Sequence, residues 1–208
     1  MPSAIHISKL TGKLEDFRAI SVNTLTNEFC NKMHKSKRKD HICPKCYSFA
    51  LLTGFRKNVA PPLERNSRLL SSRLLSIDDE LPFINDAYFR FDAHGELINH
   101  THLLNYINIA RKNHGCNFAL WTKRKDLINK YFKLGLTKPN NLILIYSNPL
   151  VSSIMDTPPK YFDRTFNNVL EHEEVERQNC TGQQCKDCLL CYTPNNGVTT
   201  IVEKVKRY

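Results

Sequence analysis

Long hydrophobic runs are absent from this sequence of 208 residues. No stretch approaches the roughly 18 consecutive apolar residues of a membrane-spanning helix. The opening residues, MPSAIHISKL, also lack the apolar centre of a secretory signal peptide. Both absences argue against a membrane protein or a secreted protein. We therefore expect a cytoplasmic location and no membrane partner.

Several common catalytic signatures are also missing. The sequence has no Walker loop for nucleotide phosphates and no G-x-S-x-G elbow for a nucleophilic serine. It shows no evident pair of carboxylates for acid–base catalysis, no internal repeat and no low-complexity tract. P-loop and α/β-hydrolase chemistry are therefore not expected, and the candidate chemistry must come from other residue types.

Acidic residues are the minority charge. The chain has 20 Asp and Glu against 30 Lys and Arg, a formal net charge of +10. The basic excess is concentrated in residues 32–73, with 11 basic and two acidic residues, and in residues 111–138, with eight basic and one acidic. Two basic segments favour a polyanionic partner such as nucleic acid or a nucleotide. A solvated basic surface is the alternative explanation.

Cysteine is the residue type with the most informative spacing. Seven of the eight cysteines fall into two groups: Cys30, Cys43 and Cys46, and then Cys180, Cys185, Cys188 and Cys191. Thiols stay reduced in the cytoplasm, so grouped cysteines there indicate metal binding or catalysis before disulfides. Cys116 stands apart from both groups, and we interpret it as an ordinary buried thiol.

The second group can complete a metal centre by itself. Its four thiolates lie within the twelve residues CTGQQCKDCLLC. The close C-x2-C-x2-C triple is typical of iron–sulfur ligation. Structural zinc more often uses two separated pairs of ligands. We expect a 4Fe–4S cluster here, with zinc as the alternative.

The first group has only three cysteines, one fewer than a closed site requires. His34 or His41 is available as a fourth ligand, which would make a structural zinc site. If the fourth position stays free, a 4Fe–4S cluster has one iron open to an exogenous ligand. The sequence leaves both alternatives open. A thioredoxin-like dithiol of Cys43 and Cys46 would give Cys30 no role.

Alternating strand and helix patterns predict an α/β fold. Residues 17–25, 85–93, 116–121, 141–147 and 164–170 have the composition of strands, and helical patterns cover 46–55, 63–77, 103–113 and 124–135. This alternation predicts a mostly parallel sheet, and about five strands suit an open or partial (β/α) barrel. We expect residues 1–170 to form this core, and residues 171–208 to form a cysteine-rich metal-binding segment packed on it.

In such folds the catalytic and ligand-binding residues lie at the carboxyl ends of the strands. Cys30, in a predicted loop, follows the first strand there. Lys123 and Arg124 follow the third strand, so they are candidates to bind a substrate phosphate or carboxylate. Basic surface residues at a helix start are the alternative. We interpret the histidines of HGELINHTH, residues 94–102, as solvated side chains.

The segments ISKLTGKL, NTLTNEFC, ICPKCYS, RFDAHGELIN and FALWTKR resemble the phage "gene product eighty-eight" domain family over most of the chain. This resemblance implies a bacteriophage or prophage protein that works in the cytoplasm of the infected bacterial host. It implies no defined activity.

The three cysteines followed by a glycine–glutamate turn also resemble the radical S-adenosylmethionine (SAM) enzymes. This resemblance implies that Cys30, Cys43 and Cys46 hold a 4Fe–4S cluster whose open iron is chelated by SAM. It further implies that Gly95 and Glu96 contact the SAM amino group, and that the second group holds an auxiliary cluster. The spacing departs from the usual C-x3-C-x2-C by a basic insert at residues 31–42.

The expected function is therefore that of a phage iron–sulfur protein, similar to radical SAM enzymes, acting on a nucleotide or nucleic-acid substrate. The alternative is a non-enzymatic binding module whose fold is stabilised by iron–sulfur clusters or zinc. In that case its basic segments would bind nucleic acid or a host protein.

Overall fold

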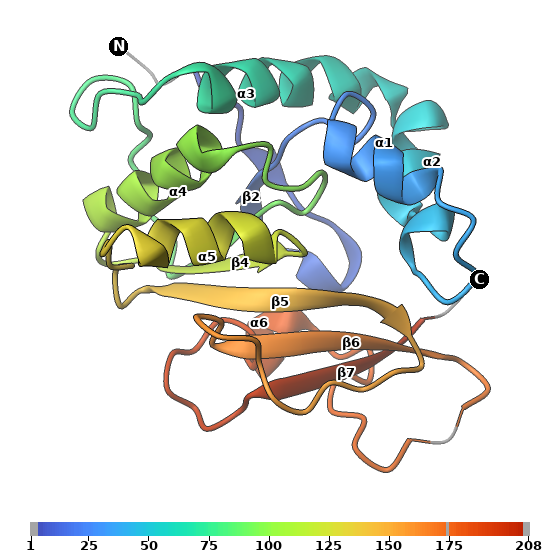
Figure 1. The fold of residues 1–208 in the computed structure, drawn as a ribbon. Coiled ribbons are helices and arrows are strands. Elements are labelled where there is room, and N and C mark those ends of the chain that lie inside the picture. Colours follow the sequence, from blue (N-terminus) through green and yellow to red (C-terminus); the bar gives the residue numbers. More distant parts are fainter. Residues whose placement is uncertain (1–3, 174, 206–208) are drawn as a thin grey trace.

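A computed structural model of the chain describes residues 4–173 and 175–205, and seven strands in it form one open, mostly parallel sheet (Figure 1). In chain order they are β1 (Ser8–Lys9), β2 (Arg18–Ile20), β3 (Tyr88–Phe91), β4 (Asn117–Thr122), β5 (Leu142–Val151), β6 (Arg164–Leu170) and β7 (Thr200–Val205). Each strand pairs with the next one in the sequence, β1 antiparallel and the others parallel. The prediction of an open α/β sheet is confirmed.

The helices are α1 (Glu28–His34), α2 (Tyr47–Thr53), α3 (Ala60–Ser72), α4 (His100–Lys112), α5 (Lys125–Lys133) and α6 (Cys185–Cys188), with 3-10 turns at Gly12–Leu14, Cys43–Lys45 and Lys57–Val59. Parallel crossovers are right-handed, and here the strand order always advances in one direction. Accordingly, α3, α4 and α5 lie on one face of the sheet, as Figure 1 shows, whereas α6, between β6 and β7, packs against the second core on the other face.

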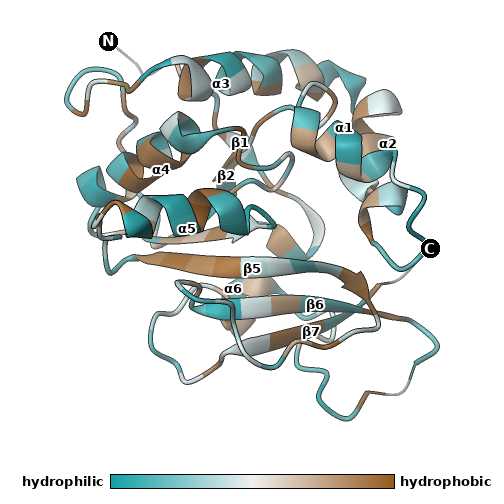
Figure 2. Ribbon diagram, in the orientation of Figure 1, coloured by the Kyte–Doolittle hydropathy of each residue, from teal (hydrophilic) through white to brown (hydrophobic). Residues whose placement is uncertain are grey.

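Two hydrophobic cores flank the sheet, and β5 contributes to both. Successive side chains of a strand point to opposite faces. Accordingly, Leu142 and Leu144 pack in the core beneath the helices, whereas Ile143 and Ile145 pack in the second core. The segment LILI at the start of β5 is apolar throughout, as expected for a central parallel strand. Accordingly, the first half of β5 is largely brown in Figure 2. The second core includes Tyr192 from the cysteine-rich segment, which thus covers the face opposite α3, α4 and α5.

The structure has two strands that the sequence analysis did not predict. β1 is only two residues long, and β7 lies within residues 171–208, which were expected to be a metal-binding segment. β7 pairs with β6 at six positions from Thr165–Thr200 to Leu170–Val205. The segment Thr200–Val205 therefore belongs to the main sheet. Its mixed sequence, TIVEKV, gives only a weak strand pattern without this partner.

Two further expectations were wrong. Cys30 lies in α1 instead of a loop, because Asn27 supplies an N-cap. His102 is fully buried in α4 rather than solvated, and its Nδ1 accepts a hydrogen bond of 3.2 Å from the backbone N–H of Ile98. Cys116 is buried at the start of β4, as expected. Among the described residues, no helix combines the length and apolar character needed to cross a bilayer.

Candidate functional site

A cavity of about 510 Å³ is lined by residues from both cysteine groups. Its lining includes Cys30, Cys43, Cys46, Gly95, Glu96 and Lys123 from the first part of the chain, and Cys180, Cys185 and Cys191 from the second. Gly95 and Glu96 follow β3, and Lys123 follows β4. The cavity therefore lies at the carboxyl ends of the strands, where ligands bind in open parallel sheets.

Cys30 is positioned by the first turn of α1. The side-chain oxygen of Asn27 accepts a hydrogen bond of 3.1 Å from the backbone N–H of Cys30. The side-chain amide of Asn27 donates to the backbone oxygen of Glu96 at 2.7 Å. One buried asparagine thus joins the helix that bears the first thiol to the turn that follows β3.

The basic insert between Cys30 and Cys43 is held by β5. Two backbone hydrogen bonds, of 2.9 and 2.8 Å, join residues 40–42 to residues 149–151 in an antiparallel arrangement. The 3-10 turn with Cys43 begins directly after this pairing. The insert therefore carries Cys43 and Cys46 across the sheet to the cavity that Cys30 lines, despite the unusual spacing.

The two histidines considered as fourth ligands lie elsewhere. The ring of His34 stacks on Phe49 with a centroid distance of 3.9 Å, and its Nδ1 lies 3.2 Å from the backbone oxygen of Cys43. His41 is held in the backbone pairing with Leu150. Neither side chain lines the cavity, and the same holds for every other histidine in the described part of the chain.

The two residues after Cys46 attach α2 to the turn after β3. The hydroxyl of Tyr47 donates to the backbone oxygen of Ala93 at 2.5 Å. The hydroxyl of Ser48 lies 2.8 Å from Nδ1 of His94. The cysteine–tyrosine–serine sequence is thus explained by local structure, since its side chains hold the third thiol against residues 92–96.

Gly95 is required by a close contact with β2's end. Its φ of +85° lies in the left-handed region, and a Cβ there would lie 2.5 Å from both the Cγ2 and the backbone oxygen of Val22. Any side chain would push the turn away from the sheet. The role of Gly95 in this structure is therefore to let the turn approach the neighbouring strand end.

Glu96 is buried, with 3% of its surface exposed. Its carboxylate accepts hydrogen bonds from the Thr122 hydroxyl at 2.5 Å, the Lys123 backbone N–H at 2.8 Å and the Leu97 backbone N–H at 2.9 Å. A carboxylate offers about four acceptor positions, so three are already used by the protein. Glu96 thus fastens the β3 turn to the end of β4. Burial raises its pKa, against the opposing effect of Lys123.

Lys123 provides positive charge beside the first three thiols. Its Nζ donates to the Ser147 hydroxyl at 3.0 Å. Burial lowers the pKa of its ammonium group, but the negative charges of Cys43 and Glu96 outweigh this effect and raise it. A retained cation at this place stabilises anionic thiolates electrostatically.

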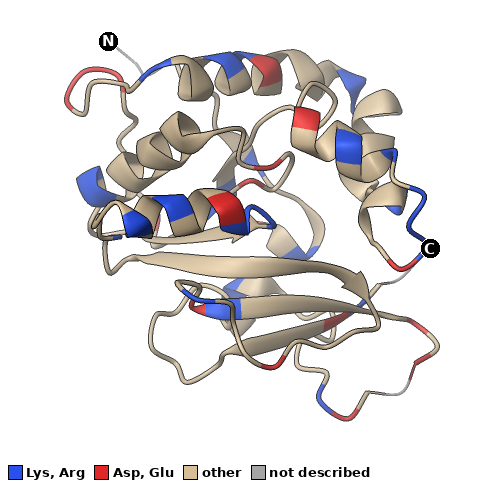
Figure 3. Cartoon of the chain, viewed as in Figure 1, with Lys and Arg blue, Asp and Glu red and all other residues tan. Residues whose placement is uncertain are grey.

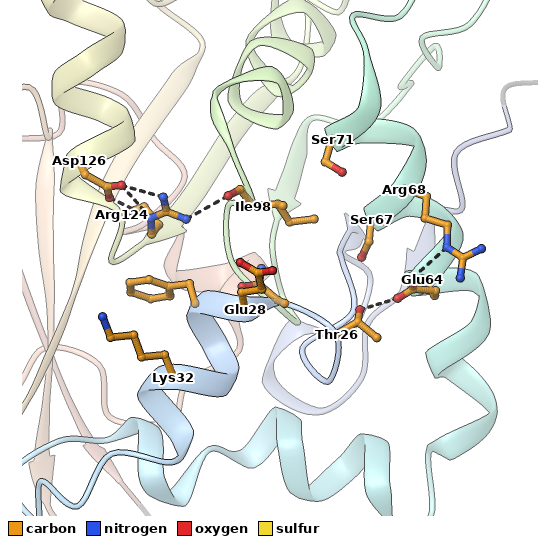
Figure 4. A pocket seen from close by; sticks show the side chains of 12 residues that line it. Thr26, Glu28, Lys32, Glu64, Ser67, Arg68, Ser71, Ile98, Arg124 and Asp126 are labelled. Carbon is orange, nitrogen blue, oxygen red and sulfur yellow. Dashed lines mark hydrogen bonds and ion pairs between the residues drawn. The ribbon is translucent and has the colours of Figure 1, made fainter.

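Arg124 points into a different pocket. Its guanidinium donates to the backbone oxygens of Leu97 and Ile98 at 2.9 and 3.1 Å, and it forms a 2.7 Å ion pair with Asp126 (Figure 4). This second pocket, of about 560 Å³, is lined by residues of α1, α3 and α5. Arg68 in it is likewise paired, with Glu64 at 3.1 Å. The sequence neighbours Lys123 and Arg124 therefore do not share one binding surface.

In the second cysteine group, Cys180, Cys185 and Cys191 line the first cavity, whereas Cys188 does not. The amide of Gln183 donates to the sulfur of Cys188 at 3.3 Å. Across the described residues, all eight cysteines are free thiols, and no three His, Cys, Asp or Glu side chains form a ready-made site for a single ion.

Arg164 of β6 holds the loop after α6 in place. It donates to the backbone oxygens of Leu190, Thr193 and Val198, the last two at 2.5 and 3.0 Å, and to Oδ1 of Asn196 at 2.9 Å. Burial lowers its pKa. The loop thus has a polar support from the protein itself, independent of any metal.

Sequence reasoning missed several charged residues of the cavity, among them Arg90 and Asp92. Arg90 lies within the predicted strand 85–93 and stacks over Trp121, with its guanidinium carbon 4.1 Å from the ring centroid. Asp92 directly follows β3. Glu96 was indicated by the family resemblance, which does not extend to Asp92, and the predicted strand 85–93 included Asp92, so the rule for carboxyl ends did not single it out.

Comparison with known proteins adds no assignment. No family model matches the chain, and neither the curated proteins nor the solved structures contain a significant match. The two family resemblances therefore stay predictions.

Proposed function

We propose that the cavity holds a 4Fe–4S cluster on Cys30, Cys43 and Cys46, and that it is the active site of a radical-SAM-like enzyme. The main supporting observation is that three thiols and the Gly95–Glu96 turn, from separate crossover segments, line one cavity, and that no described histidine is among its lining residues. In this proposal the open sheet functions as a partial (β/α) barrel.

The donor set matches a cluster with one open iron in number and type, because it consists of three thiolates. A structural zinc ion needs four ligands at about 2.0–2.3 Å, and no three candidate ligands of the described residues converge in that way. A cubane cluster is larger than an ion, so its thiolates lie farther apart. Three thiolates without a fourth ligand also leave one iron available to SAM.

When bound, the cluster would supply an electron to SAM. The chain's own residues have other tasks. Lys123 offsets the negative charge of the thiolates, and the pairing of residues 40–42 with β5 keeps Cys43 and Cys46 in place. Glu96 fastens the turn that contacts the cofactor. Trp121 and Phe166 form part of an apolar wall that limits access of water.

The second cysteine group is part of the same proposal. Cys180, Cys185 and Cys191, from the C-terminal part of the chain, line the same cavity. A second cluster on this group would therefore lie at the same cavity as the first one, where it would relay electrons or hold substrate. Zinc at this group is the alternative.

The proposed substrate is a nucleotide or nucleic acid. Much of the second basic segment is used within the fold, because Arg111, Lys112, Arg124 and Lys138 all donate to backbone oxygens. In the first segment, Lys35, Lys37 and Lys39 are exposed after α1. Figure 3 shows blue on α1, α3 and α5, each with red beside it.

The second candidate is a metal-stapled, non-enzymatic module that binds nucleic acid or a host protein. The exposed lysines after α1 favour this binding module, since they lie outside the cavity and would bind a partner without any reaction at the cavity. In that case both cysteine groups would serve stability alone.

Anaerobic purification from iron-replete cells tests the proposal. We expect iron and sulfide in excess of zinc, and a change in the electron paramagnetic resonance signal of the reduced cluster when SAM is added. Cys43→Ser should abolish the response to SAM, whereas Cys180→Ser and the matched control Cys116→Ser should keep it. Stoichiometric zinc without sulfide, or a cluster indifferent to SAM, would contradict the enzyme and leave the binding module.

A further inference from the structure

Asp92 has a strained backbone at the end of β3. Its φ of +54° lies in the left-handed region. This region is unfavourable for residues with a Cβ, although aspartate tolerates it better than most. Its backbone N–H donates to the backbone oxygen of Ile20 at 2.9 Å, which anchors the residue to β2. Strain of this kind is often retained at functional sites.

The carboxylate of Asp92 is buried and only half satisfied. The residue is 5% exposed. Its Oδ1 accepts a hydrogen bond of 2.8 Å from the hydroxyl of Tyr106, a ring stacked on Phe91 at 4.1 Å. Its Oδ2 has no hydrogen-bond partner among the described residues. A buried carboxylate oxygen without a partner is costly, and such groups are rare in folded proteins.

Asp92 also lines the cavity of the three thiols. Burial is the largest factor that raises its pKa, and the negative charge of Glu96 adds to this effect, while Tyr106 and Arg90 oppose it. The cavity thus disfavours a charged carboxylate here. A cationic donor from a ligand would both satisfy Oδ2 and compensate the charge.

We infer that Asp92 is a ligand-binding residue of this cavity, and that its Oδ2 accepts a hydrogen bond from the protonated primary amine of the bound ligand. The inference rests on the proposed function, in which that ligand is SAM. An amine is favoured over an anionic group because Arg90 and Lys123 line the same cavity and suit the ligand's carboxylate. Glu96, with three protein donors, has less capacity for this contact.

Asp92→Asn is the central variant, because asparagine also tolerates a positive φ and can still accept from Tyr106. It removes the charge and places an amide on the ligand side. The probes are SAM and methylthioadenosine, which lacks both the amine and the carboxylate. Binding is measured by calorimetry on anaerobic, cluster-loaded protein, together with iron content and melting temperature.

We expect Asp92→Asn to weaken SAM binding at least 10-fold and to leave methylthioadenosine binding, iron content and melting temperature unchanged. Tyr106→Phe removes the donor to Oδ1 and should weaken SAM binding by a smaller factor. The matched control is Asp86→Asn. Asp86 pairs with Arg18 at 2.7 Å and does not line the cavity, so SAM binding should not change.

Three results would overturn the inference while the proposed function stands. They are equal SAM affinity in Asp92→Asn and wild type, an equal loss of methylthioadenosine affinity, and loss of iron from the variant. If cluster-loaded wild type binds no SAM, both the inference and the proposed function fail.

Discussion

The side-chain amide of Asn27 donates to the backbone oxygen of Glu96 at 2.7 Å. The same asparagine caps α1 by accepting from the N–H of Cys30. The position of the first thiol therefore depends on the turn after β3, although 66 residues separate Cys30 from Glu96 in the sequence. The thiol and the glycine–glutamate turn form one connected unit.

Under the proposed function, Asn27→Ala should lower both stability and iron content. Loss of the cap alone costs about 1 kcal/mol. Asn99 is a matched control, since it caps α4 by accepting from the N–H of His102 and donates to the backbone oxygen of Ser71. Both alanine variants should lose similar stability in urea titrations, but only Asn27→Ala should lose iron. Equal iron loss in both variants would contradict a specific link to the thiols.

Gly95→Ala should destabilise the protein more than Gly135→Ala. Both glycines have a positive φ, +85° and +75°, but a Cβ at Gly135 meets nothing within 4 Å. Gly135→Ala should therefore cost about 1 kcal/mol, from the backbone alone. Gly95→Ala adds the clash with Val22 and should cost at least about 2 kcal/mol more. The difference in unfolding free energy measures the contact, and similar losses would show that it relaxes easily.

Arg164→Met should loosen the loop that contains Leu190, Thr193 and Val198. It leaves three backbone oxygens without their charged donor, and each such hydrogen bond contributes about 1.5–3 kcal/mol. Hydrogen exchange of residues 190–198 should rise, and stability should fall by at least about 3 kcal/mol. Arg177→Met, which removes an ion pair between exposed side chains, should change stability by less than about 0.5 kcal/mol. Unchanged exchange in Arg164→Met would mean that another element holds the loop.

Stability should fall in acid partly because of His102. Burial lowers its pKa from 6.5 to about 3. Below pH 6.5 the imidazole of His102 takes up a proton in the unfolded chain but stays neutral in the folded protein. Unfolding free energy should therefore drop as pH falls from 6.5 towards 3, with a maximal slope of about 1.4 kcal/mol per pH unit for this group.

The variant His102→Asn should flatten that slope, since asparagine retains an acceptor for Ile98 but does not titrate. His114→Gln, at an exposed position, is the comparison variant. Denaturant titrations between pH 7.5 and pH 5 give the comparison. An identical slope in His102→Asn would show that other groups dominate.

Neutralising Lys37, Arg38 and Lys39 together should weaken binding to single-stranded DNA. Each lost phosphate contact should reduce the slope of log affinity against log salt by about 0.7. Exposed Lys130 and Lys133, from the second basic segment, serve as the comparison pair. Absence of DNA binding by wild type at low salt would favour a merely solvated basic surface.

Sequence patterns alone determined much of the scaffold. Apolar runs such as LILI predicted the central strands, because a parallel strand buried on both faces needs apolar side chains throughout. The rule for carboxyl ends indicated Cys30, Lys123 and Arg124 as neighbours, and the family resemblance indicated Glu96. Cys30, Glu96 and Lys123 line one cavity, whereas Arg124 lines a different pocket. β7 was missed, since its mixed sequence alone does not predict a strand, and the strand forms by pairing with β6.

Only the tertiary structure decided how the chemistry-bearing residues are used. Spacing in the sequence does not show that the insert of residues 31–42 pairs with β5, or that Lys123 and Arg124 enter different pockets. It also does not show that Oδ2 of Asp92 lacks a partner in the described structure. The physical reason is the same in each case. Periodicity reports which face of an element is apolar, whereas hydrogen bonding and burial depend on segments that are distant along the chain.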